Sequence, residues 1–95
     1  MSQLDYASVS IRDVIEHYRD LSANPHVGLA TQQAAQALAD ILRRTWSVRL
    51  TVEHVVQWVY STRRSVQSWQ QTERAEAQDR LVIYEQFLAE VGVRL

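Results

Sequence analysis

Apolar residues recur along this chain at the spacing of α-helices and not at that of β-strands. In the first periodic segment, the apolar positions follow the i, i+3, i+4, i+7 rule that places side chains on one helical face. They are Ile11, Val14, Ile15, Tyr18 and Leu21. Ser10, with Asp13 three residues later, forms a variant of the capping box, and Pro25 ends the segment because the residue before a proline avoids the α region. The pattern predicts a helix over residues 10–22.

Two further segments have the same helical period. Residues 30–46 place alanines and larger aliphatic side chains on one face, which predicts a helix that packs closely against a neighbour. Residues 72–92 have an apolar stripe wider than one neighbouring helix needs to cover. We therefore expect this last helix to contact two neighbours, one of them in a second copy of the chain. The residues expected at that dimer interface are Ala77, Leu81, Tyr84, Leu88 and Val91.

The segment between them, residues 52–70, fits two different structures. Its valines recur at helical spacing, but one straight helix would centre its buried stripe near Arg63 and Gln70. Either the helix breaks around residues 60–62, or its period shortens to 3.5 residues and moves these polar side chains off the stripe. With both options open, the chain is predicted to be all-α: a single small domain over residues 1–95 with about four helices.

Residues 62–69 read Thr-Arg-Arg-Ser-Val-Gln-Ser-Trp and follow the valine-rich segment. In this order the two segments resemble the helix-turn-helix of small bacterial and phage regulators, whose second helix has the form Ser/Thr-Arg-Arg-Ser/Thr-Val-x-x-Trp. Two positions within residues 51–70 depart from that family. Tyr60 stands where a glycine usually provides the positive φ of the turn, and Val56 stands where a smaller residue usually lets the helices cross closely.

This resemblance implies a small non-catalytic regulator that binds duplex DNA as a homodimer. Val66 and Trp69 would anchor the second helix on the first. In the major groove, Arg can read guanine, Gln can read adenine, and Ser can contact phosphate. The candidate DNA-binding residues are Thr62, Arg63, Arg64, Ser65, Gln67 and Ser68.

A fainter resemblance extends over residues 14–69. The residues that carry it are the first helical segment, Asn24-Pro25-His26-Val27 and the alanine-rich residues 34–42. They are similar to the N-terminal helical domain of translation initiation factor 2B regulatory subunits, although the larger ligand-binding domain of that family has no counterpart here. This resemblance, too, implies an all-helical fold.

Charged residues are segregated along the chain, although the net charge is only −1. All ten basic residues are arginines, and residues 43–74 carry six of them with two acidic residues, a formal charge of +4. Residues 1–42 and 75–95 are acidic, at −3 and −2. A basic centre suits DNA, but it suits an acidic protein surface or a second copy of the chain equally well. The alternative function is therefore a helical protein–protein adaptor or assembly factor without a nucleic-acid role.

Three tryptophans, Trp46, Trp58 and Trp69, lie within this basic centre. Aromatic rings among arginines can stack on single-stranded nucleic acid. Packing in a core or at an interface is the more common use of tryptophan in a small helical bundle, and we expect that use here.

The types of residue present favour neither an enzyme nor a metal site. The chain has no cysteine, which excludes disulfides and thiolate ligands. Asp13 and His17 lie one helical turn apart and could supply half of a metal site, but no second group of ligands has a matching spacing. No apolar run has the roughly 18 residues that a membrane helix needs. We expect a soluble, cytoplasmic protein with no catalytic residues, no cofactor, no metal and no membrane contact.

Overall fold

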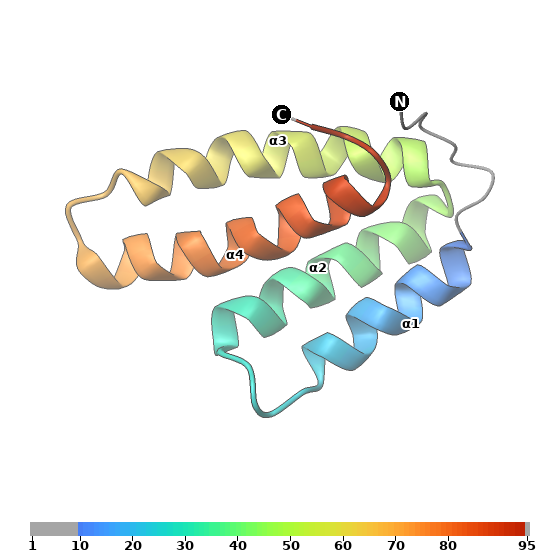
Figure 1. Ribbon diagram of the computed structural model, residues 1–95, viewed down its shortest axis with the longest axis horizontal. Helices are drawn as coiled ribbons and strands as arrows, with labels where there is room; N and C mark the ends of the chain where they lie inside the picture. The colour runs from blue at the N-terminus through green and yellow to red at the C-terminus, as the bar shows by residue number, and fades with distance from the viewer. Residues whose placement is uncertain (1–9, 95) are drawn as a thin grey trace.

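The structure, a computed structural model, describes residues 10–94 and contains four α-helices in that range (Figure 1). The helices are α1 (Ile11–Ser22), α2 (Leu29–Thr45), α3 (Val48–Val66) and α4 (Gln71–Glu90). No strand occurs among the described residues, so the all-α prediction is confirmed. The ranges predicted for the first, second and fourth helices agree with the observed ones to within two residues at each end. None of these helices is long and apolar enough to cross a membrane.

The helices form two antiparallel hairpins, α1–α2 and α3–α4, which pack on each other mainly through α2 and α4 (Figure 1). α2 contacts all three other helices. Small side chains permit this close packing, because Ala34, Ala35 and Ala39 are all buried. The α3–α4 hairpin extends past the α1–α2 pair at its turn, on the left of Figure 1. Residues near that turn therefore have only the other helix of their own hairpin to pack against.

One hydrophobic core joins the two hairpins. Tyr18 of α1 is fully buried, and its ring meets Phe87 of α4 edge to face, with the ring centroids 6.0 Å apart. Ser10 caps α1 as predicted, because its side chain accepts a hydrogen bond from the Asp13 amide at 3.3 Å. The largest fully buried apolar side chains are Tyr18, Leu38, Leu42, Val55, Val59, Phe87 and Leu88.

The apolar stripe of α4 does not form an exposed face. Ala77, Tyr84, Leu88 and Val91 each have at most 7% of their surface exposed within the single chain, and Leu81 is partly buried. The stripe contacts two neighbours, as predicted, but both of them, α2 and α3, belong to the same chain. Within one chain α2 and α3 therefore already cover these residues, and the homodimer stays a prediction.

α3 is one unbroken helix, so of the two options for residues 52–70 the break around residues 60–62 does not occur. It begins at Val48, where Ser47 caps it by accepting a hydrogen bond from the Leu50 amide at 3.2 Å. The helix-turn-helix predicted over residues 52–70 is therefore not formed, since the turn falls at residues 67–70 and the next helix is α4. Arg63 creates no conflict with one straight helix, because α3 continues past Val59, its last fully buried residue.

Candidate functional site

The candidate DNA-binding residues lie together near the far end of the α3–α4 hairpin. Thr62, Arg63, Arg64 and Ser65 occupy the end of α3, Gln67 caps it, and Ser68 lies in the turn. These residues therefore sit at the C-terminal end of a long helix and not on a separate recognition helix. That end carries the partial negative charge of the helix dipole, which the two arginines of the last turn offset.

Ser68 is engaged in the turn itself. Its hydroxyl donates a hydrogen bond to the Glu73 carboxylate at 2.9 Å and accepts one from the Gln70 amide at 3.1 Å. Beside it, the Trp69 side chain is 86% exposed. The prediction that Trp69 packs against the preceding helix is therefore wrong, because the turn directs this ring into solvent.

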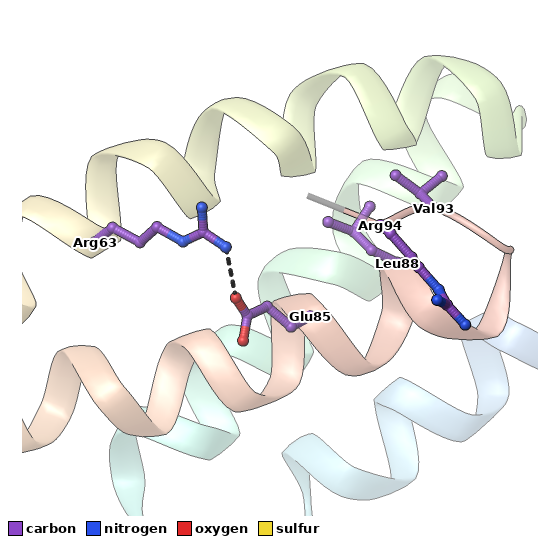
Figure 2. A pocket seen from close by; sticks show the side chains of 5 residues that line it. All are labelled: Arg63, Glu85, Leu88, Val93 and Arg94. Atoms are coloured by element: carbon purple, nitrogen blue, oxygen red, sulfur yellow. Dashed lines mark hydrogen bonds and ion pairs between the residues drawn. The ribbon is translucent and has the colours of Figure 1, made fainter.

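Arg63 joins the two helices of the hairpin. Its guanidinium donates a hydrogen bond to the Glu85 carboxylate, with Nη2 and Oε2 3.0 Å apart (Figure 2). The central carbon of the Arg63 guanidinium lies 5.9 Å from the centre of the Tyr60 ring, one turn earlier on α3. This distance is within range of a cation–π interaction. Both charged side chains are nearly half exposed, so the pair itself contributes at most about 1 kcal/mol to stability. The pair places a hydrogen-bond donor and an acceptor side by side on the surface.

An open hollow of about 260 Å³ lies beside this ion pair. Its lining residues are Arg63, Glu85, Leu88, Val93 and Arg94 (Figure 2). The last two come from the chain after α4, which turns back at Gly92 with a φ of 82° and is held by a hydrogen bond of 2.8 Å from the Val93 amide to the Leu88 carbonyl. The sequence signal for this turn is Gly92, which directly follows Val91, the C-cap of α4.

Two exposed apolar side chains flank the ion pair. Tyr60 is 51% exposed and lies one turn before Arg63, while Val82 is 62% exposed and lies one turn before Glu85 on α4. We call these four residues and the adjoining hollow the α3–α4 face. Apolar groups beside a fixed donor and acceptor can bind an amphipathic surface, because they bury apolar area and pair polar groups at the same time.

The Tyr18 hydroxyl has a strongly perturbed pKa, but Tyr18 is a core residue and does not belong to the α3–α4 face. Burial raises the pKa of its hydroxyl, and the nearby charge of Glu90 raises that pKa further. The hydroxyl stays neutral and donates a hydrogen bond of 3.4 Å to the Glu90 carboxylate, which joins α1 to the end of α4.

Asp13 and His17 both lie on α1, and no group of three or more potential metal ligands occurs among residues 10–94.

Comparison of the chain with protein-family models, with curated proteins and with solved structures finds no match to any of them.

Proposed function

We propose that this chain is a small, non-catalytic protein–protein interaction module that docks a partner on its α3–α4 face. The observation that supports it is the exposed Tyr60 and Val82 on either side of the Arg63–Glu85 pair and its hollow. Tyrosine and arginine are the residue types that interfaces favour, because each combines a large contact area with a polar end.

The geometry supports duplex DNA less well. A groove-reading helix needs free side chains at its N-terminal end, whereas the arginines here lie at the C-terminal end of α3. A phosphate contacting Arg63 would also compete with Glu85 and meet its negative charge. A protein surface can instead use both members of the pair, since it can offer an acceptor to Arg63 and a donor to Glu85.

Affinity capture from a lysate of the source cells tests this proposal. The protein is immobilised as the wild type, as the double variant Tyr60→Ser/Val82→Ser, and as the control Leu29→Ser. Leu29 is 65% exposed on α2 and lies outside the α3–α4 face, so its variant removes a similar apolar surface elsewhere. We expect a protein that the wild type and the control retain and that the double variant loses.

Titration with random-sequence duplex DNA, monitored by tryptophan fluorescence, tests the competing function, which is DNA binding. Trp69 lies next to the arginine-rich end of α3 and needs no added label. We expect no binding at low salt. Binding at low salt that weakens steeply at physiological salt would overturn the proposal, because it would show that several arginines neutralise phosphates.

A further inference from the structure

The turn between α2 and α3 holds Trp46 in a strained backbone conformation. Its φ of 49° and ψ of 36° place it in the left-handed region, and it is the one non-glycine residue with positive φ among residues 10–94. A side chain there costs roughly 1–2 kcal/mol relative to glycine. Trp46 is also 56% exposed, so burial of its ring does not explain why this residue occupies the position.

A compact hydrogen-bond network fixes this turn. The Thr45 and Thr51 hydroxyls lie 2.9 Å apart, and the Thr51 hydroxyl also donates to the Ser47 carbonyl at 2.8 Å. Thr51 is completely buried, and the Trp46 amide donates to the Leu42 carbonyl at 2.8 Å. Because these bonds order the turn before any partner arrives, binding there loses little conformational entropy.

The chain segment that contains Trp46 carries charge of a single sign, and Asp40 and Glu53 bound it on either side. Arg43, Arg44 and Arg49 are all exposed, and no acidic residue occurs from position 41 to position 52. None of the three arginines forms an ion pair in the part of the chain that the structure describes. Leu50, 40% exposed, adds an apolar side chain one turn into α3. Three exposed arginines that lie close in the chain to two exposed apolar side chains are complementary to carboxylates next to an apolar residue.

We propose that this surface binds an acidic segment of a partner protein. We call it the Trp46 corner; its residues are Arg43, Arg44, Trp46, Arg49 and Leu50. Aspartate or glutamate side chains pair with the arginines, while an apolar side chain of the segment packs on the exposed tryptophan ring. The Trp46 corner shares no residue with the α3–α4 face, so this inference can be tested independently of the function proposed above.

A nucleic-acid strand fits the Trp46 corner less well than a short acidic segment. A strand binds by stacking successive bases on several aromatic rings, whereas the corner presents one. An extended polyanion would also reach the acidic residues that precede and follow the basic centre, in a chain with a net charge of −1. A short segment interacts only with the local arginines.

Fluorescence anisotropy with labelled probes tests the inference. The probes are a peptide of Asp, Glu and Leu, the same peptide with Lys at every acidic position, and an oligothymidine of equal charge. The variants are Trp46→Gly, which suits the left-handed backbone, and the triple variant Arg43→Gln/Arg44→Gln/Arg49→Gln. The control, Arg12→Gln/Arg19→Gln/Arg64→Gln, removes as much charge from other exposed positions.

We expect the acidic peptide to bind the wild type and the control alike, and to bind each corner variant at least about tenfold more weakly. We expect the Lys peptide not to bind. The inference is overturned if the acidic peptide fails to bind the wild type at low salt, or if the control triple variant loses as much affinity as the corner triple variant. Tighter binding of the oligothymidine than of the acidic peptide would also overturn it, in favour of a single-strand site.

Discussion

Trp46 occupies a backbone conformation that favours glycine over every other residue. At positive φ, glycine has no Cβ to clash, whereas alanine retains that clash. We expect Trp46→Gly to be more stable than Trp46→Ala by about 1 kcal/mol. Urea unfolding of the two variants measures the difference, and equal free energies of unfolding would show that the turn is not held in the left-handed region.

Tyr18 makes stability depend on alkaline pH. Its pKa in the folded protein is raised above the ordinary value of 10.0 by burial and by Glu90, and burial also raises the pKa of Tyr84. The unfolded chain therefore loses these protons first, so the stabilisation is complete below about pH 10 and is lost as the pH rises further. Urea unfolding between pH 7 and pH 11 should show Tyr18→Phe losing less stability than the wild type. Equal losses would contradict this account of the buried hydroxyl.

A helix cap can be predicted from the sequence where its hydrogen bond involves only residues next to it in the chain. Ser10 was recognised as a cap because a serine before an apolar periodic segment needs only its own neighbours to act as one. Thr51 is also a residue type that caps helices, but it lies buried inside α3, since Ser47 caps the helix one turn earlier. Several residues there are good caps, and the packing of Val48 into the core decides between them.

At the scale of the helices, hydrophobic period predicted three of the four ranges closely, because the buried residues of each of those helices recur at one helical period. The last turns of α3 extend past the core, and there the position that continues its buried stripe is the polar Arg63. A helix that buries one face throughout would need a break or a shorter period near residues 60–62, and the sequence leaves both options open. The structure has a continuous helix there.

Tyr60 distinguishes the continuous helix from the broken one. In the interior of a helix, glycine is less stable than alanine by about 1 kcal/mol, whereas in a turn with positive φ the order reverses. We expect Tyr60→Gly to be less stable than Tyr60→Ala by about 1 kcal/mol, the opposite sign from the same comparison at Trp46. A Tyr60→Gly variant that is the more stable of the pair in urea unfolding would restore the helix-turn-helix.

At the scale of the whole molecule, the α4 stripe stabilises a single chain. Leu88 is 2% exposed within one copy, so Leu88→Ala should lower the free energy of unfolding by about 2–5 kcal/mol. Thermal unfolding at several protein concentrations checks whether Leu88 stabilises a single chain or a dimer. We expect midpoints independent of concentration for both proteins. A wild-type midpoint that rises with concentration, and a variant midpoint that does not, would return this residue to a dimer interface.

The sequence indicated part of the candidate site and missed the rest for a topological reason. Arg63 was singled out by its local motif, but its partner Glu85 lies twenty-two positions further along the chain. Only the register of α3 against α4 brings Glu85 beside Arg63, with Tyr60 one turn before Arg63 and Val82 one turn before Glu85 on their own helices. That register depends on how many core residues interlock, which hydrophobic period alone does not specify.

The central claim, that the α3–α4 face docks a protein, is tested most directly by mapping where a captured partner touches this chain. Backbone amide chemical shifts are recorded for the labelled protein with and without that partner. We predict that the largest changes lie at Tyr60, Arg63, Val82 and Glu85 and around the neighbouring hollow. Changes confined to α1, or spread over the exposed arginines without affecting Tyr60 and Val82, would contradict the account.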